Sequence, residues 1–275
     1  MHSHAHFIQV NGRECGTYTI VSQLIWREFF YCMSANNPFY GEMERNPICI
    51  DVPWYDIPEQ LEAFENGKTG FPFIDAGIRQ MRQEGWIHHI VRNALSMFLT
   101  RGDLWLNWEP GYELFMNYLI DGDWAVCSGN WMWVSSSAFE KSLNSSFCLD
   151  PTVYGWRVDP NGCYVKKYLP ELADMPVEYV YSPWKAPLEV GQQESIGRTK
   201  LTSLQLQVQE KAKCIIGKDY PHPMVDHKAA SQRNCRNMEE LQKLLLARCN
   251  MEPDHVKPSD ASEVKKFFNL EPREN

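Results

Sequence analysis

Residues 86–101 read WIHHIVRNALSMFLTR and carry large apolar side chains at positions 87, 90, 91, 95, 98 and 99. Intervals of this kind place the apolar side chains on one face of a helix. Gly102 follows directly, and glycine commonly ends a helix. The stretch therefore predicts an amphipathic helix whose apolar face is buried in a core.

Similar helical patterns continue on both sides of this stretch. Apolar residues at helical spacing, bounded by Ser, Gly, Pro and Asn, predict helices over residues 23–35, 57–66, 73–84, 112–120, 127–143 and 236–248. Ser22 is the expected N-cap of the first of these helices. Residues 150–187 are expected to be rich in loops, and no stretch alternates strictly enough to predict a strand. These patterns favour an all-α fold.

The composition is that of a folded chain with an acidic surface. The 275 residues are 44% hydrophobic and 23% charged, far from the composition of disordered proteins. The net charge of −8 argues against a protein that binds nucleic acid by neutralising phosphates. No apolar run approaches the roughly 18 residues that a membrane span needs, and the amino terminus has no apolar signal region. The chain is therefore expected to be neither membrane-spanning nor secreted.

Cysteine and histidine give no sign of a metal site. The nine cysteines are scattered and contain no Cys-x-x-Cys pair, which suits a reducing compartment better than a disulfide framework or structural zinc. His2, His4 and His6 alternate at the extreme amino terminus, where no fixed ligand geometry is implied. The sequence therefore predicts no metal ligand.

Five motifs follow one another in the middle of the chain. They are TGFPFIDA at residues 69–76, WIHHIVRN at 86–93, FLTRGDLW at 98–105, DGDW at 121–124 and GNWMW at 129–133. Together they resemble the FAD-binding half of the cryptochrome and photolyase family, over a span from Gln23 to about Leu246. The run CSGNW at residues 127–131 begins with Cys127. This run resembles the corresponding run of the insect-type, light-sensing animal cryptochromes. The fold implied is the family's all-α FAD-binding domain, without the α/β antenna domain that precedes it in family members.

The resemblance also implies a division of the chain. Residues 1–21 are unrelated to the family, residues 22–250 form the FAD-binding helical domain, and residues 251–275 form a C-terminal tail. The segment at about 191–209 is rich in Gln, Ser and Thr and is expected to be a flexible insertion. The family's phosphate-binding loop precedes this region and is not in this sequence. Weak or absent FAD binding is therefore expected.

The resemblance assigns residues to a flavin pocket. Arg92 and Asp121 pair across the flavin, and Cys127 faces the flavin nitrogen that takes up a proton. A thiol donates hydrogen bonds weakly, so Cys127 would be a poor source of that proton. The complete set of implied FAD-binding residues is Gln23, His89, Arg92, Asp121, Gly122, Asp123, Cys127 and Asn130. Trp26 is the implied residue of the cavity above the flavin.

Tryptophan is unusually frequent, with ten residues. Trp131, Trp108, Trp54 and Trp105 match the family's chain of electron-donating tryptophans. Indole is large, polarizable and easily oxidised, which suits this role. Trp105 and Trp108 are three residues apart and would share a helix face if the segment were helical.

Two positions weaken an enzymatic interpretation. Photolyases receive a flipped DNA lesion near Trp26 and Gln23, but a photolyase for cyclobutane dimers would more usually carry glutamate at position 23. The family resemblance implies that repair of six-four photoproducts needs two histidines four residues apart. In this sequence His89 is followed at that spacing by Asn93. The chain is therefore expected not to be an enzyme, and no catalytic residue is assigned.

The function implied by the resemblance is that of a blue-light photoreceptor flavoprotein of the circadian clock. Clock proteins such as Timeless or Period and a ubiquitin ligase are the implied partners, in the cytoplasm and nucleus; DNA and membrane are not expected partners. One alternative is a light-independent interaction module or repressor fragment that does not hold FAD. The other is a DNA photolyase. Flavin content distinguishes the interaction module from the photoreceptor. Light-dependent loss of DNA lesions distinguishes the photolyase from it.

Overall fold

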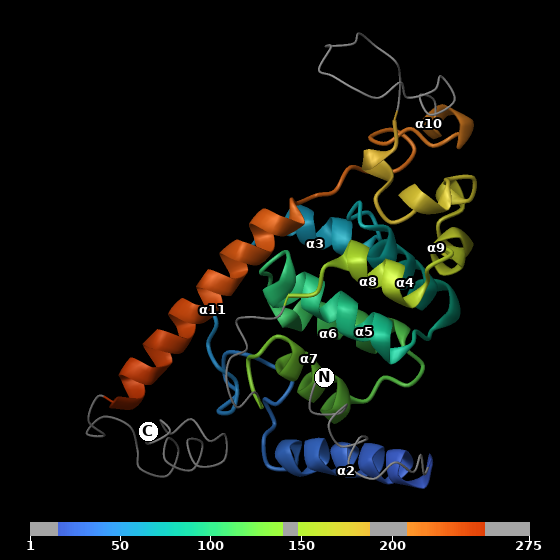
Figure 1. Cartoon of the computed structure of the whole chain (residues 1–275). Coiled ribbons are helices and arrows are strands. Elements are labelled where there is room, and N and C mark those ends of the chain that lie inside the picture. Colours follow the sequence, from blue (N-terminus) through green and yellow to red (C-terminus); the bar gives the residue numbers. More distant parts are fainter. Residues whose placement is uncertain (1–15, 140–147, 188–207, 251–275) are drawn as a thin grey trace.

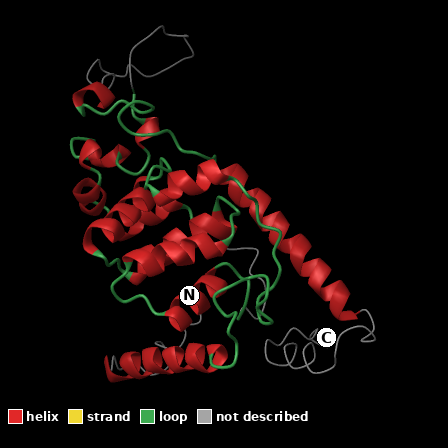
Figure 2. Cartoon of the chain, turned by 180° about the vertical axis from the view of Figure 1, so that it is seen from behind, coloured by secondary structure: helices red, strands yellow, loops and turns green. Residues whose placement is uncertain are grey.

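The architecture was analysed in a computed structural model that describes residues 16–139, 148–187 and 208–250. All regular structure in these ranges is helical, and Figure 2 shows no strand among them. The expectation of an all-α fold is confirmed. No helix within these ranges is long and apolar enough to cross a lipid bilayer. Residues 1–15 of the predicted segment 1–21, the predicted tail 251–275 and most of 191–209 lie outside the described residues.

The described ranges contain ten α-helices. They are α2 (Gly16–Ser34), α3 (Pro58–Glu65), α4 (Pro72–Glu84), α5 (His89–Met97), α6 (Trp108–Tyr118), α7 (Trp124–Val134), α8 (Pro151–Val158), α9 (Cys163–Tyr168), α10 (Val208–Lys211) and α11 (His227–Asn250). The predictions over residues 57–66 and 73–84 are confirmed within two residues. Gly85 ends α4 with a φ of 68°, the left-handed conformation that glycine adopts at low cost.

Several expectations need correction, and one is the helix predicted over residues 127–143, because α7 ends at Val134. The helix predicted over residues 86–101 is shorter: α5 ends at Met97, and a π-helical turn, η1 (Phe98–Gly102), follows it. The non-helical backbone of Thr100, with φ −96° and ψ −115°, interrupts the regular spiral there. Ser22 is not a helix cap, because α2 already begins at Gly16. Residues 150–187 contain α8, α9 and three short 3₁₀ turns, so they are more helical than the pattern suggested.

The helices enclose one large core (Figure 1). α4, α5, α6 and α7 pack against one another in its centre, α8 and α9 cover α4, and α2 lies along α7 at the base in Figure 1. The core is built from aromatic and aliphatic side chains that are almost completely buried, among them Phe64, Ile74, Leu95 and Met132. A second, smaller cluster contains Trp105 and side chains of α11. Side chains of α5, α6 and α7 therefore hold fixed positions relative to one another.

The long helix α11 crosses one side of the domain and is anchored at its start (Figure 1). Its first residue, His227, places Nδ1 2.7 Å from Oδ1 of Asp103, which is fully buried behind η1. Nε2 of His227 lies 3.8 Å from Asp150. Further along α11, the Asn234 side chain donates a 2.8 Å hydrogen bond to the carbonyl of Gly102. These contacts tie α11 to the centre of the fold.

The anchor at His227 predicts that stability depends on pH. Burial alone lowers the pKa of His227, but the hydrogen bond and charge of Asp103 outweigh it, so the pKa is raised above 6.5. A raised pKa stabilises the folded state below the unfolded value of about 6.5, and the effect is lost as pH rises through the folded pKa. We expect urea unfolding to give a lower free energy of unfolding at about pH 8 than at about pH 6. The free energy of unfolding of the variant His227→Gln should depend less on pH. If it changed equally between about pH 6 and about pH 8 in the variant and the parent protein, the prediction would be contradicted.

Candidate functional site

An ion pair joins α5 to the loop before α7. The Arg92 guanidinium nitrogen Nη2 donates to both carboxylate oxygens of Asp121, at 3.0 and 2.9 Å. Its Nε donates to the carbonyl of Ile87 at 2.9 Å, which fixes the side chain at a second point. Arg92 is 23% exposed and Asp121 47% exposed, so the pair faces solvent on one side. A cation is thus held in a defined place at the surface.

The start of α7 brings two more predicted residues beside this pair. Asp123 caps the helix, because its Oδ1 accepts a 2.8 Å hydrogen bond from the amide of Val126. Its Oδ2 accepts a 2.7 Å hydrogen bond from the Tyr31 hydroxyl of α2. Cys127, one turn into the helix, is buried, and this burial raises the pKa of its thiol. The thiol is therefore protonated near neutral pH. It interacts electrostatically with Arg92 and Asp121.

The other predicted pocket residues lie on the same three helices. Gln23 on α2, His89 at the start of α5 and Asn130 on α7 are exposed, and Gly122 lies exposed in the loop before α7. The Asn130 amide donates to the carbonyl of Val126 at 2.8 Å. Trp26 on α2 packs edge to face against Trp133, with ring centroids 5.0 Å apart. The described contacts thus join Arg92 to Asp121 and α2 to α7, while no described contact reaches Gln23.

The chemistry of this donor set fits a flavin. A flavin ring carries hydrogen-bond acceptors and becomes negatively charged when it is reduced, and a fixed guanidinium stabilises such charge. Asp121 and Asp123 offer carboxylate acceptors, and the buried Cys127 thiol is a weak proton donor. Tyr31 was missed from the sequence, because its contact with Asp123 joins residues 92 positions apart.

Trp131 lies one turn beyond Cys127 on α7 and packs directly on α6. The indole is 2% exposed and contacts Phe115 edge to face, with centroids 5.0 Å apart. Gly111 makes the close approach possible: a Cβ there would lie 2.3 Å from Cη2 of Trp131 and 2.6 Å from Cδ2 of Leu99. Trp108 begins α6 and is one helical turn from Gly111. The packing at Gly111 therefore brings α7 and its indole within one turn of Trp108.

Within the described part of the chain, three of the four predicted electron donors have indole N–H groups without a nitrogen or oxygen acceptor. These are the buried Nε1 atoms of Trp54, Trp108 and Trp131. Trp108 is fully buried, and its polar neighbour is the Cys49 thiol. Burial raises the pKa of Cys49 to about 12, so this neighbour stays uncharged. Among the described residues, no basic nitrogen or oxygen accepts a hydrogen bond from these three indoles.

Trp105 and Trp54 form a pair on the other side of η1. Their ring centroids are 4.9 Å apart at an interplanar angle of 54°, and the Trp105 indole donates to the carbonyl of Pro53 at 3.0 Å. Trp105 does not share a helix face with Trp108 as expected, because α6 begins only at Trp108. It instead adopts a φ of 58°, a left-handed conformation that costs a bulky residue about 1–2 kcal/mol. This strained backbone turns the indole toward Trp54.

The close contact at Gly111 predicts a large effect of a small substitution. Gly111→Ala adds a methyl group inside contact distance of Trp131 and Leu99. Alanine favours helix by about 1 kcal/mol, but overpacking a core costs about 1–3 kcal/mol. We expect a net loss of stability in urea unfolding and an altered fluorescence of the displaced indole. Asn117→Ala, on the exposed side of α6, is the matched control. A stabilised Gly111→Ala protein would show that the two helices are not in close contact.

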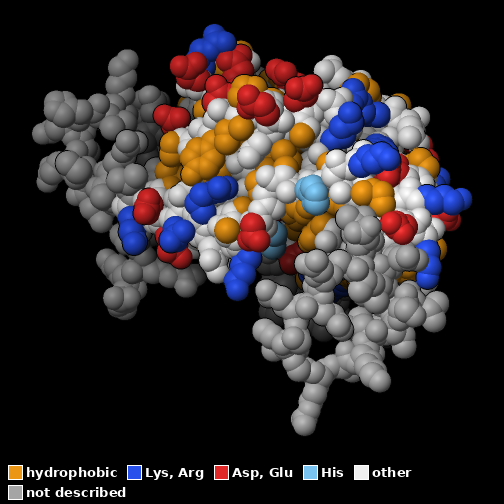
Figure 3. All heavy atoms as spheres, turned by 90° about the horizontal axis from the view of Figure 1, so that it is seen from above, with side chains coloured by type: hydrophobic (Ala, Val, Ile, Leu, Met, Phe, Trp, Pro, Cys, Tyr) orange, Lys and Arg blue, Asp and Glu red, His pale blue; other side chains and the backbone are white. Residues whose placement is uncertain are grey.

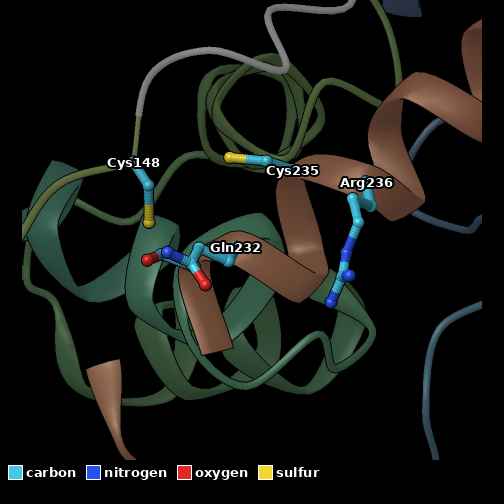
Figure 4. Close-up of a pocket in the computed structure, with 5 residues that line it drawn as sticks. Cys148, Gln232, Cys235 and Arg236 are labelled. Carbon is cyan, nitrogen blue, oxygen red and sulfur yellow. The ribbon is translucent and has the colours of Figure 1, made fainter. Parts of the chain in front are cut away.

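The described residues also contain two features that the sequence did not predict. A cavity of about 470 Å³ lies between Cys148 and the α11 residues Ser231, Gln232, Cys235 and Arg236, and includes none of the predicted flavin residues (Figure 4). Ligand atoms of Asp103, Cys148 and His227 lie within 4.8 Å of one another. The strongest contact of this group is the hydrogen bond between Asp103 and His227, which anchors α11.

Comparison with known proteins shows which family the chain is related to. Residues 20–240 match the model of the family described as the FAD binding domain of DNA photolyase. Cryptochrome-1 of Aedes aegypti is 49% identical over 266 residues, which cover 96% of this chain and 46% of the mosquito protein. Cryptochrome-1 of Drosophila melanogaster is 43% identical over 275 residues, which cover 97% of this chain and 47% of the fly protein. The chain thus spans about half the length of these relatives.

Solved structures agree with the sequence comparison. A bacterial class III photolyase from Agrobacterium tumefaciens superposes with a TM-score of 0.66 and 29% identity, over 82% of this chain and 42% of the photolyase. A Synechocystis cryptochrome shares the fold with a TM-score of 0.65 at 22% identity, over 84% of this chain and 44% of that protein. The chain therefore belongs to the cryptochrome and photolyase family and consists largely of that family's FAD-binding domain.

Proposed function

We propose that this chain belongs to a blue-light photoreceptor of the circadian clock, in which tryptophans deliver an electron to FAD after light absorption. The observation that carries this proposal is the burial of Trp131 on α7 and Trp108 at the start of α6, together with the contact of Trp105 with Trp54. These four indoles form the proposed line of donors. The similarity to insect Cryptochrome-1 proteins supports it.

The residues of the site have distinct tasks in this proposal. FAD, when bound, supplies the absorption of blue light and accepts the electron. Arg92, held by Asp121 and by the Ile87 carbonyl, provides the positive charge that compensates the added electron. Cys127 contributes little proton donation, because its buried thiol is a weak donor. Gln23, His89, Gly122, Asp123 and Asn130 complete the proposed pocket, and Trp26 lines the cavity above it.

The indoles pass the electron in sequence. Trp131 donates first, Trp108 then restores Trp131, and the Trp105–Trp54 pair restores Trp108. The N–H groups of Trp54, Trp108 and Trp131 have no nitrogen or oxygen acceptor among the residues that the structure describes, so an oxidised indole in the interior keeps its proton. A proton lost at this stage would trap the electron vacancy on one indole. Retention of the indole proton therefore lets the vacancy move outward.

The resulting change of charge would signal to clock proteins such as Timeless or Period and to a ubiquitin ligase, in the cytoplasm and nucleus. We also propose that the chain is not an enzyme, because Gln23 and Asn93 depart from the residues expected in photolyases. The face in Figure 3 mixes acidic, basic and apolar side chains, and the whole chain carries a net charge of −8. Such a surface gives little support to DNA binding.

The first test is the visible absorption spectrum of the purified chain, mixed with FAD and then washed, before and after blue illumination. Retained flavin bands that bleach in light and recover in the dark are the expected result. Arg92→Ala should weaken the retention of FAD, whereas Arg157→Ala on α8, which is outside the proposed pocket, should not. Retained FAD that does not respond to light would refute the photoreceptor. A chain that retains none would favour the flavin-free interaction module.

A further inference from the structure

An arginine of α11 lies over an exposed tyrosine beside the Trp54–Trp105 pair. The guanidinium carbon of Arg233 is 5.3 Å from the ring centroid of Tyr55, the residue that follows Trp54. Tyr55 is 38% exposed, and its amide donates a 2.8 Å hydrogen bond to the carbonyl of Trp105. Tyr55 is thus fixed beside both members of the indole pair, at the border with solvent.

Arg233 is held in this position by the core of the domain. Its Nη2 donates a 3.0 Å hydrogen bond to the carbonyl of Asp103, and its Nε donates one of 3.0 Å to the side chain of Asn234. Asn234 is itself fully buried and bonded to the carbonyl of Gly102. The side chain amide of Asn237, one turn later on α11, donates to the Tyr55 hydroxyl at 3.3 Å. These hydrogen bonds therefore hold the Arg233 guanidinium over the phenol ring of Tyr55.

A cation over an aromatic ring makes that ring harder to oxidise. The attraction depends on the electrons of the ring face, and removing one of them replaces attraction by repulsion. An exposed tyrosine next to an oxidised indole would otherwise be a convenient electron donor, because its phenol proton can leave to water. Trp54 and Trp105 share no described contact with a cation of this kind, so the charge of Arg233 acts most strongly on Tyr55.

We propose that Arg233 prevents the oxidation of Tyr55 and so keeps the electron vacancy on the Trp54–Trp105 pair; this inference rests on the proposed function. The suppressed step moves one electron from the Tyr55 ring to the oxidised indole and the phenol proton to water. It would leave a neutral indole and a neutral tyrosyl radical. Arg233 is thus a residue that controls where the photochemical charge separation ends.

The test oxidises the FAD-free chain from outside, so it does not depend on flavin binding. A flash of light on ruthenium tris-bipyridine, with cobalt(III) pentaammine chloride as electron acceptor, oxidises accessible aromatic side chains. Electron paramagnetic resonance of samples frozen after the flash then separates tyrosyl from tryptophanyl radicals. The tyrosyl signal of Tyr55 is the difference between each protein and the same protein carrying Tyr55→Phe.

We expect Arg233→Gln to raise the Tyr55 signal about fivefold, the factor that corresponds to about 1 kcal/mol of cation–π interaction. Arg233→Lys keeps the charge and should stay close to the parent protein. Arg82→Gln removes the comparable cation over Tyr118 and should leave the Tyr55 signal unchanged. Equal signals in the parent and Arg233→Gln, or equal increases in the Gln and Lys variants, would overturn the proposal.

A second variant keeps the test decisive if Arg233→Gln does not fold. Asn237→Asp leaves Arg233 in place and introduces a negative charge beside the Tyr55 hydroxyl, so the Tyr55 signal should rise. An unchanged or smaller signal in Asn237→Asp would overturn the proposal. The failure of the proposed function has a different signature: FAD that is retained but not reduced in light, whatever residue occupies position 233.

Discussion

Replacing Asp75 with alanine is expected to remove about 3–5 kcal/mol of stability, because it leaves several buried hydrogen-bond donors unsatisfied at a cost of about 1–3 kcal/mol each. Asp75 is fully buried at the start of α4. Its Oδ1 accepts hydrogen bonds from the amide and hydroxyl of Thr69, at 2.8 and 2.7 Å. Its Oδ2 accepts one from the amide of Gly70 and one from the hydroxyl of Tyr220. The substitution would leave four buried donors without an acceptor.

The effect should be large because this carboxylate joins distant parts of the chain. Tyr220 is 145 residues away in sequence, and the amide of Met224 donates to the carbonyl of Thr69 at 2.9 Å in the same region. A typical domain has only about 5–15 kcal/mol of stability, so the variant should unfold at a much lower urea concentration or fail to accumulate. This loss is measured by urea unfolding followed by circular dichroism.

Two variants show whether the network is the cause. Tyr220→Phe removes a single donor and should cost about 1 kcal/mol. Asp174→Ala removes an exposed carboxylate and should change stability by less than about 0.5 kcal/mol. If Asp75→Ala proved no less stable than Asp174→Ala, the carboxylate would not hold these segments together.

The helices of this fold were predictable from the sequence where apolar spacing and stop residues coincide. α4 is the clearest case, because its buried face and the left-handed Gly85 both leave a signal in the sequence. The interruption of the helix at Thr100 left none, because apolar residues continue at helical spacing through Leu99. Tertiary contacts decided there: the amides of Asp103 and Leu104 both bond to the carbonyl of Phe98, which closes a wider turn.

The candidate site was predictable in its residue types and less so in its geometry. The resemblance named Arg92 and Asp121 as partners on opposite sides of a flavin, and the structure pairs them directly. Contacts that depend on chain segments far apart, such as Tyr31 with Asp123 and Arg233 with Tyr55, have no sequence pattern. The left-handed backbone of Trp105 was equally hidden, because tryptophan rarely adopts it and its contacts with Trp54 and Pro53 come from a distant segment.

Trp108 provides the sharpest test of the electron path. It is fully buried at the start of α6, one helical turn from the contact of Gly111 with Trp131 and three residues after Trp105. Trp108→Phe keeps an aromatic ring in the core but removes the easily oxidised indole. We expect the rate of FAD reduction under continuous blue light to fall by more than about tenfold, which corresponds to about 1.4 kcal/mol or more. Without a second donor, the vacancy on Trp131 is refilled by the electron it gave away.

The control for Trp108→Phe is a tryptophan outside the path. Trp184 packs edge to face on Phe71, with centroids 5.7 Å apart, in the part of the core formed by the 3₁₀ turns. Trp184→Phe should therefore reduce stability slightly and leave photoreduction unchanged. The comparison uses proteins with equal FAD content and is followed by absorption during illumination. If Trp108→Phe matched the parent protein in rate, the electron would reach Trp131 by another route, and the line of indoles would be core packing.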